Sequence, residues 1–226
     1  MNRLNWVTCL LTLALPASAG DIQGHAVITK RLTKKALSPI VYNLRGAVPG
    51  PPAPSQAARE SEFDRLVVVL EGGASRPKPP ETVVINQRNM RFEPDLVVVP
   101  TGSTVQFPNA DPIFHNIFSL SKTQPFDLGF YPQGQSRTLK FNHNGIVQVY
   151  CHIHANMYAA IVVTSSPWYA RPAEDGSFSW SDVPAGHYRL TAWHKIAGLF
   201  KTEIDVRESG TTDTTIRIPV DVDTER

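Results

Sequence analysis

Residues 145–164 read GIVQVYCHIHANMYAAIVVT, two apolar segments joined by a loop that is rich in metal ligands. The segments GIVQVY and AAIVVT contain many β-branched residues, and this residue type favours β-strands. The loop between them carries Cys151, His154 and Met157 in the spacing C-x2-H-x2-M. The stretch therefore predicts two neighbouring strands that hold a thiolate, an imidazole and a thioether at one end.

Similar strand signals recur on both sides of this stretch, and helical periodicity is nearly absent. Short β-branched runs alternate with turn residues such as the PTG at 100–102 and the Asn-Gly pair at 144–145. Many short strands with regular turns are typical of β-sandwiches and barrels. We therefore predict an all-β protein whose other strands lie at 65–70, 81–86, 96–99, 103–107, 136–141, 176–180, 187–194, 201–206 and 214–220.

The length of the chain allows one large or two small domains. Residues 46–62 are rich in Pro, Ala and Ser, and we interpret them as a surface loop or linker. We expect a first sandwich at 80–166 and a smaller β-sandwich at 167–226. Residues 20–79 are expected to contribute N-terminal strands and the Pro/Ala-rich loop.

Residues 167–226 are few for a free-standing sandwich. The segment 24–46, alone or with 65–71, can supply the first strands of that second sandwich, which would then be discontinuous. The alternative is an irregular N-terminal arm packed on the first sandwich. The sequence leaves both arrangements open.

The N-terminus has the order of features found in a secretory signal peptide. Arg3 precedes an apolar run at 6–15, and the ASA at 17–19 provides a small-x-small cleavage site. The apolar run is too short to span a bilayer, and no other run looks transmembrane. We therefore interpret residues 1–19 as a signal peptide and expect an exported, periplasmic protein that begins near Gly20.

The chain contains two cysteines, Cys9 and Cys151. Cys9 lies inside the predicted signal peptide, so the mature chain would contain Cys151 alone and no intramolecular disulfide. A lone thiol in an oxidising compartment persists when it is buried, paired with another chain or bound to a metal. Cys151 is therefore the first candidate ligand.

The residue types in the loop favour copper. Thiolate and thioether sulfurs suit Cu(I), and imidazole is also a ligand of Cu(II). A trigonal set of two histidines and one cysteine with a weak axial methionine is the blue-copper arrangement. Zinc is the rival metal, but a tetrahedral zinc site has no use for Met157. The loop therefore needs one more histidine from elsewhere in the chain.

His115 is the best candidate for that second histidine. It lies in FPNADPIFHNIFS, far enough before Cys151 for two or three strands to return the chain to the same end of a sandwich. His152 is a local competitor, but neighbouring side chains in an extended segment face opposite ways, so we expect it to point away from the metal. The remaining histidines are interpreted as structural: His25, His143, His187 and His194.

The stretch FPNADPIFHNIFS…FDLGFYPQGQSRTLKFNHNGIVQVYCHIHANMYAAIVV at 107–163 resembles the cupredoxins, in particular the plastocyanin- and amicyanin-like group. The resemblance implies a Greek-key β-sandwich that binds one copper ion. The four ligands that it implies are His115, Cys151, His154 and Met157. It also implies that Asn116, outside the ligand set, ties the two ligand loops together. Two positions depart from the family pattern: His152 is unusual there, and Ile153 stands where several relatives have proline.

A second resemblance concerns residues 171–194, which read RPAEDGSFSWSDVPAGHYRLTAWH. The pattern D-G-x-F-x-x-x-x-V-P-x-G-x-Y is similar to the carboxypeptidase regulatory-like, or transthyretin-like, β-sandwich. Modules of that kind usually act as scaffolds or binding surfaces, some of them for carbohydrate. The resemblance implies such a role for residues 167–226.

Composition and motifs exclude several other functions. The formal net charge is +2 and there is no long basic run, so nothing indicates nucleic-acid binding. No G-x-S-x-G, H-E-x-x-H or Gly-rich phosphate loop is present. A complete set of four ligands also leaves no open position for a substrate at the metal, so we do not expect an enzyme.

We therefore expect a periplasmic type 1 copper protein that transfers one electron at a time and docks briefly with a redox protein. Two alternatives remain open at this point. One is a copper-binding or copper-delivery protein, and the other is a secreted β-sandwich binding module without a redox role.

Overall fold

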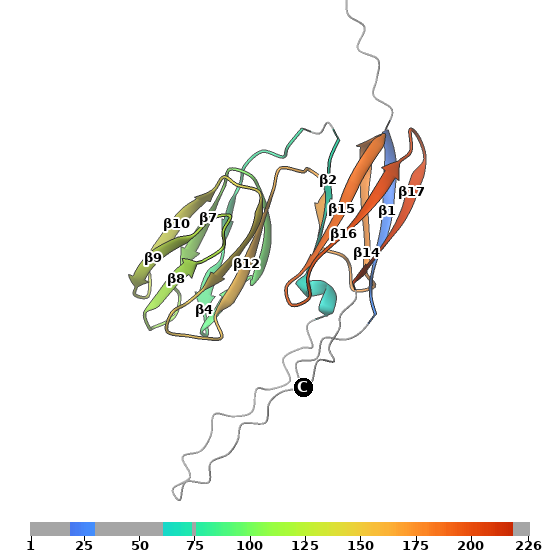
Figure 1. The fold of residues 1–226 in the computed structure, drawn as a ribbon. Helices are drawn as coiled ribbons and strands as arrows, with labels where there is room; N and C mark the ends of the chain where they lie inside the picture. The colour runs from blue at the N-terminus through green and yellow to red at the C-terminus, as the bar shows by residue number, and fades with distance from the viewer. Residues whose placement is uncertain (1–18, 30–60, 74–75, 219–226) are drawn as a thin grey trace, which may run out of the picture.

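The computed structural model describes residues 19–29, 61–73 and 76–218. The prediction of an all-β protein is confirmed: strands form two sandwiches side by side, and the described residues contain one short 3-10 helix, η1 (Glu62–Arg65) (Figure 1). Among these residues, no helix is long and apolar enough to cross a membrane. The predicted signal peptide lies almost wholly outside the described part, as does the segment 30–46.

The first sandwich contains a three-stranded sheet, ordered β10-β7-β3, and a five-stranded sheet, ordered β6-β12-β11-β8-β9. A short hairpin, β4-β5, accompanies them. The strands are β3 (Thr82–Val84), β4 (Asn86–Arg88), β5 (Arg91–Glu93), β6 (Leu96–Pro100), β7 (Ser103–Pro108), β8 (His115–Ser119), β9 (Phe126–Tyr131), β10 (Ser136–Phe141), β11 (Gly145–Tyr150) and β12 (Tyr158–Thr164).

The core of the first sandwich follows the alternation of its strands. In β7 the buried positions Ser103, Val105 and Phe107 alternate with less buried ones, so that one face points into the sandwich. Val105 and Phe107 join Ile117, Val147 and other apolar side chains in one buried cluster. That cluster also contains Cys151 and Met157, so two of the expected ligands lie at the edge of a well-packed core.

The second sandwich is assembled from both ends of the chain. One sheet has the order β14-β1-β17 and the other has the order β13-β2-β15-β16. Its strands are β1 (Ala19–Ile28), β2 (Leu66–Glu71), β13 (Tyr169–Ala170), β14 (Ser177–Pro184), β15 (Gly186–His194), β16 (Gly198–Val206) and β17 (Thr211–Ile218). β1 pairs with β14 antiparallel and with β17 parallel, while β2 pairs with β13 and β15.

Several strand positions differ from the expectation. The predicted strand at 81–86 is interrupted at the buried Ile85 and divides into β3 and β4. Residues 19–28 form one strand, whereas the expectation placed the first strands of this region at 24–46. The sequence did not predict the strands β5, β8, β9 and β13, because their residue patterns are short or irregular.

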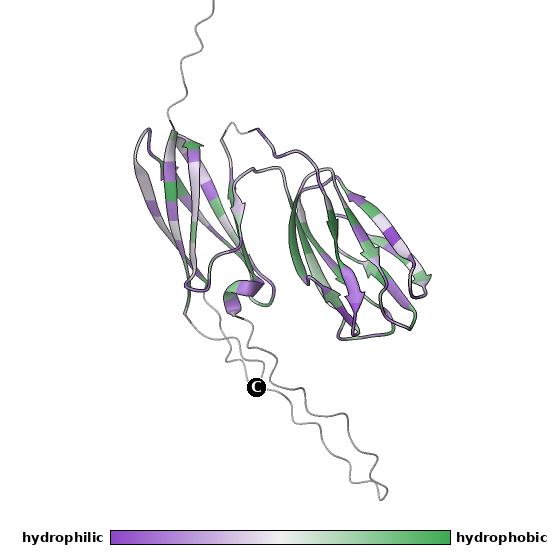
Figure 2. Cartoon of the chain, turned by 180° about the vertical axis from the view of Figure 1, so that it is seen from behind, coloured by the Kyte–Doolittle hydropathy of each residue, from purple (hydrophilic) through white to green (hydrophobic). Residues whose placement is uncertain are grey.

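The packing between the two sandwiches explains why some strands are apolar on both faces. All residues of β2 except the last are buried, because Leu66, Val68 and Leu70 face the second core while Val67 and Val69 face the first sandwich. The cluster between the sandwiches contains Val67, Val69, Leu96, Ala160, Val162 and Trp193. Figure 2 shows strongly apolar strands on the side of the first sandwich that faces the second.

Polar contacts support the same interface. Lys195 donates a hydrogen bond to Asp95 across it, and its ammonium lies 4.8 Å from the centre of the Tyr158 ring. The Ser166 hydroxyl, in the connection that follows β12, donates to the carbonyl oxygen of Leu70 at 2.5 Å. The two sandwiches are therefore held together by apolar contacts and by side chains from both.

His194 is a fully buried histidine in the second sandwich, at the end of β15. Its Nδ1 accepts hydrogen bonds from the amides of Ile196 and Ala197, at 3.3 and 3.1 Å, so this nitrogen carries no proton. Its Nε2 lies 3.2 Å from the carbonyl oxygen of Glu62 and donates to it. Burial lowers the pKa of His194 below its ordinary value of 6.5, and the Glu62 carboxylate opposes this only in part.

This arrangement makes folding stability depend on pH. The unfolded histidine binds a proton as the pH falls below 6.5, whereas the folded one binds it only at a lower pH. The stabilisation from this site is therefore present above that pH and is lost as the pH falls below it. We expect His194→Asn, whose amide oxygen can take the place of Nδ1, to remove this part of the acid dependence in urea unfolding at about pH 7.5 and about pH 5. An unchanged dependence in the variant would contradict the assignment.

Candidate metal centre

The strand order brings the expected ligands to one end of the first sandwich. His115 is the first residue of β8, and Cys151 directly follows β11. β11 pairs with both β8 and β12, so Tyr150 lies opposite Phe118 on one side and Tyr158 on the other. The loop from β11 to β12, which contains His154 and Met157, therefore closes over the start of β8.

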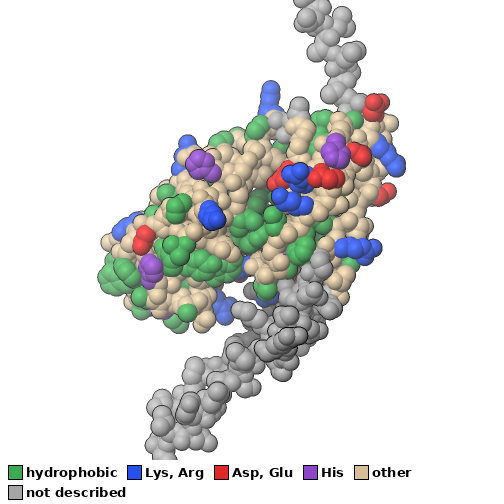
Figure 3. Space-filling model, in the orientation of Figure 1, with side chains coloured by type: hydrophobic (Ala, Val, Ile, Leu, Met, Phe, Trp, Pro, Cys, Tyr) green, Lys and Arg blue, Asp and Glu red, His purple; other side chains and the backbone are tan. Residues whose placement is uncertain are grey.

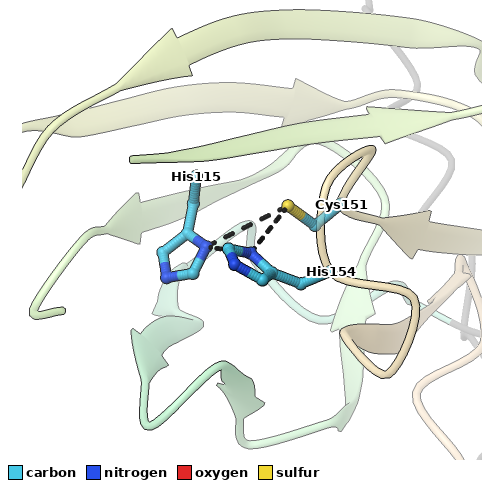
Figure 4. A group of neighbouring side chains, drawn as sticks. All are labelled: His115, Cys151 and His154. Carbon is cyan, nitrogen blue, oxygen red and sulfur yellow. Dashed lines mark hydrogen bonds between the residues drawn. The ribbon is translucent and has the colours of Figure 1, made fainter. Parts of the chain in front are cut away.

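Figure 4 shows the side chains of His115, Cys151 and His154 pointing toward one another. The two Nδ1 atoms lie 3.0 Å apart. Cys151 Sγ is 4.0 Å from Nδ1 of His115 and 3.7 Å from Nδ1 of His154. His115 and Cys151 are buried and His154 is half-buried, so the group is nearly closed to solvent.

These three distances can be tested against a metal ion. Metal–nitrogen distances of about 2.0 Å and a metal–sulfur distance of about 2.3 Å allow two nitrogens up to about 4 Å apart, or a nitrogen and a sulfur up to about 4.3 Å apart, to share one metal ion. The three observed separations, 3.0, 4.0 and 3.7 Å, all lie within these limits. The two imidazoles and the thiolate therefore fit a single metal ion.

Met157 lies in the same loop and is fully buried in the core cluster that contains Cys151. Its amide donates a hydrogen bond to the carbonyl oxygen of His154 at 2.9 Å, which closes a tight turn between the two residues. Met157 is therefore an interior residue of the loop, whereas His154 stays partly exposed.

Asp111 orients His115 and was missed by the sequence reasoning. Its Oδ2 lies 2.8 Å from Nε2 of His115, so Nε2 carries the proton and the lone pair of Nδ1 faces Cys151 and His154. The carboxylate is held in turn by the amides of Asn89 and Met90, at 2.6 and 2.8 Å. The sequence offered one indication of this role: Asp111 lies four residues before His115, the candidate ligand. That spacing alone is weak evidence for a contact.

The charge of Asp111 is stabilised although the residue is buried. Burial by itself raises the pKa of this carboxyl, but hydrogen bonds from the Met90 amide, His115 and the Asn89 amide outweigh it and hold the pKa below its ordinary value. A charged carboxylate on the far nitrogen increases the basicity of the imidazole toward a metal.

We expect Asp111→Asn to weaken copper binding by about 10- to 100-fold, because the ligand loses its charged orienting partner. Competition with a copper chelator measures this affinity. Asp213→Asn is the matched control, since Asp213 is exposed on β17 of the second sandwich and lies outside the grouped side chains. Equal affinities in the wild type and Asp111→Asn would contradict the role given to Asp111.

Asn116 joins the two segments that carry the ligands. Its Oδ1 accepts a hydrogen bond from the amide of His152 at 3.3 Å, and its Nδ2 donates to Asp127 at 2.6 Å. The Gly129 amide, followed by Asn116 and His152, holds the pKa of Asp127 below its ordinary value despite partial burial. Asn116 thereby connects the residue after Cys151 to the segment of His115.

His152 is not part of the grouped ligands. Its ring stacks on Phe118 with a centroid distance of 3.8 Å, and its Nε2 lies 3.4 Å from Asp127. About half of its side chain is exposed. His25, His143, His187 and His194 also lie outside the group.

Exposed apolar residues occur beside the ligands in the chain. Ile113 and Phe114 precede His115 and are 39% and 56% exposed, and Ile153, directly before His154, is 52% exposed. Met90, whose amide binds Asp111, is also 52% exposed. The end of the sandwich near His154 therefore has an apolar surface.

The sequence matches no protein-family model and no curated protein. Part of the chain is similar to solved structures of amicyanin. A reduced Cu(I) form at pH 4 of an amicyanin variant is 22% identical, with a TM-score of 0.35, and the match covers 37% of this chain and 82% of that one. A copper-containing nitrite reductase from Thermus scotoductus SA-01 is 24% identical with the same TM-score, over 42% of this chain and 24% of that one. Similarity at this level carries no functional argument.

Proposed function

We propose that the protein is an exported type 1 copper protein that carries one electron at a time between redox partners in the periplasm. The observation that carries this proposal is that two imidazole nitrogens, from His115 and His154, and the Cys151 thiolate lie close enough together to share one metal ion. Met157, buried in the same core cluster as Cys151, would be the weak fourth ligand. Copper bound there would supply the exchange between Cu(I) and Cu(II).

The residues around the centre support electron transfer rather than catalysis. Cys151 and Met157 belong to the packed core, and Asp111 and Asn116 hold the two ligand segments. Residues held in this way would move little when the bound copper changes its oxidation state. A small reorganisation favours fast electron transfer. With His115, Cys151, His154 and Met157 all bound, the copper would have no place left for a substrate, so we propose that the protein is not an enzyme.

The half-buried ring of His154 would be the contact point for a partner, because exposed apolar residues lie beside it in the chain. Small and weakly bound interfaces suit brief redox encounters. Phe114 and Ile153 are the exposed residues of this surface nearest to the ligands in sequence.

Electron self-exchange between the Cu(I) and Cu(II) forms of the protein tests this proposal without an identified partner. Fast exchange, measured by NMR line broadening in mixtures of the two forms, is the expected result. We expect Ile153→Glu to slow it by at least about tenfold, since two copies would then bring like charges together. Leu120→Glu is the matched control, because Leu120 is 80% exposed at the far end of β8.

The same experiment separates an electron carrier from a copper-delivery protein. A carrier retains its copper through repeated reduction and reoxidation, even with a Cu(I) chelator in solution. Loss of copper on reduction, or exchange too slow to broaden the signals, would refute the proposed function and favour delivery.

A further inference from the structure

A groove with a volume of about 490 Å³ lies between the two sandwiches, away from the copper ligands. One wall is the outer face of the β13-β2-β15-β16 sheet, and the other is formed by β11, β12 and the turn at Asn144. Figure 3 shows apolar side chains in the hollow between the two bodies and charged side chains beside its upper edge. Small-molecule sites occur preferentially at such junctions.

The wall from the second sandwich changes from apolar to charged in regular steps. Strand pairing aligns Val67, Trp193 and Leu199 in the first row. The second row contains Val69, Thr191 and Lys201, and the third contains Glu71, Arg189 and Glu203. Because outward positions along a strand are two residues apart, these rows lie one above the other on the same face.

The wall from the first sandwich carries no charged side chain. Its apolar side chains are Ile146 on β11 and Val162 and Val163 on β12. The polar ones are already engaged, since Asn144 donates to the Ser165 hydroxyl at 2.8 Å and accepts a hydrogen bond from Thr101. All charges that line the groove therefore belong to the second sandwich.

The charged residues that line the groove are Glu71 and Lys201. Neither belongs to an ion pair among the described residues. Arg189, the cross-strand neighbour of Glu71, is influenced by its charge but is paired with Glu203 at 2.9 Å. Glu71 accepts one hydrogen bond, from Thr191 at 3.2 Å, which leaves acceptor positions on its carboxylate. The Glu71 carboxylate and the Lys201 ammonium group therefore lie on adjacent rows, next to the apolar first row.

We propose that this groove binds a small zwitterion with an apolar side chain, such as a free apolar amino acid. The ammonium group of the ligand binds Glu71 and its carboxylate binds Lys201. The apolar side chain lies on Val69, Ile146 and Trp193. A ligand with only one charge, or with no apolar group, leaves part of this surface unmatched.

Isothermal titration of the full mature protein with L-phenylalanine tests the proposal, and the fluorescence of Trp193 offers a second signal. Three analogues each lack one feature: phenethylamine has no carboxylate, 3-phenylpropionate has no ammonium group, and glycine has no apolar side chain. We expect each to bind at least about tenfold more weakly than phenylalanine, because a charge-assisted hydrogen bond or a buried ring is lost.

Variants locate the site. Lys201→Met and Glu71→Gln should each weaken phenylalanine binding by about tenfold or more, while Lys140→Met, an exposed position on β10 of the first sandwich, should not change it. Circular dichroism checks that each variant is folded, and an unchanged visible spectrum of the copper-loaded form separates this groove from the metal centre. No binding at millimolar phenylalanine, equal binding of the analogues, or equal binding by Lys201→Met would overturn the proposal.

Discussion

Replacing Cys151 with serine is expected to abolish the visible colour of the Cu(II) protein completely. A thiolate bound to Cu(II) gives an intense charge-transfer band in the visible range, and a serine hydroxyl cannot replace it as a ligand. Cys151 Sγ is the sulfur atom in the group with His115 and His154, so its loss removes the electronic basis of the band.

The measurement is the visible spectrum of copper-loaded Cys151→Ser beside that of the wild type. His152→Ala is the matched control, because His152 is the next residue and its ring stacks on Phe118 outside the ligand group. The control should keep both copper and colour. A visible band of normal intensity in Cys151→Ser would show that the thiolate is not a ligand.

Truncation of His115 is expected to have the second-largest effect. His115→Ala removes one equatorial nitrogen and opens a cavity beside Asp111, which held Nε2 of the missing ring. The colour should be lost or strongly altered in buffer alone. Added imidazole should restore part of the colour. The small ring can enter the cavity and bind the metal through one nitrogen, while the N–H of its other nitrogen donates a hydrogen bond to Asp111.

The measurement is the visible spectrum of the copper-loaded variant during an imidazole titration. His143→Ala serves as the control, since His143 lies in an exposed turn before β11 and outside the metal group. The spectrum of His143→Ala should match that of the wild type and should not change when imidazole is added. Normal colour in His115→Ala without imidazole would exclude His115 from the ligand set.

Local patterns in the sequence were sufficient to predict the all-β class. β7, β10 and β11 combine strand-forming residues with turn signals at their ends, and their positions follow from that pattern. β8 and β9 were not predicted, because polar residues and glycine interrupt their apolar patterns. β8 reads HNIFS and begins with a candidate ligand, and β9 reads FDLGFY and contains an acid and a glycine. Functional residues weakened the strand signal where the site is built.

The sequence could not decide how the second sandwich is assembled. β1 pairs in parallel with β17 at the other end of the chain, and nothing in either segment specifies a partner so distant. The apolar run of β2 did contain a clue, since a strand without alternation needs cover on both faces. Only the structure identifies the first sandwich as the cover of its outer face.

The candidate site was more predictable than its surroundings because its chemistry depends on residue type and spacing. Cys151 and His154 lie in one loop, and His115 was the histidine best placed to join them. Asp111 was missed because a carboxylate in a turn has many ordinary roles. Its role becomes visible only when the hydrogen bond to Nε2 of His115 is seen.

Reconstitution of the purified mature protein with Cu(II) tests the central claim most directly. Bound copper is counted by elemental analysis while the visible spectrum is recorded before and after reduction. The predicted result is one copper ion per chain, with an intense visible band that disappears on reduction and returns on reoxidation. A protein that binds one copper ion and stays colourless in its Cu(II) form would contradict a centre made of His115, Cys151, His154 and Met157.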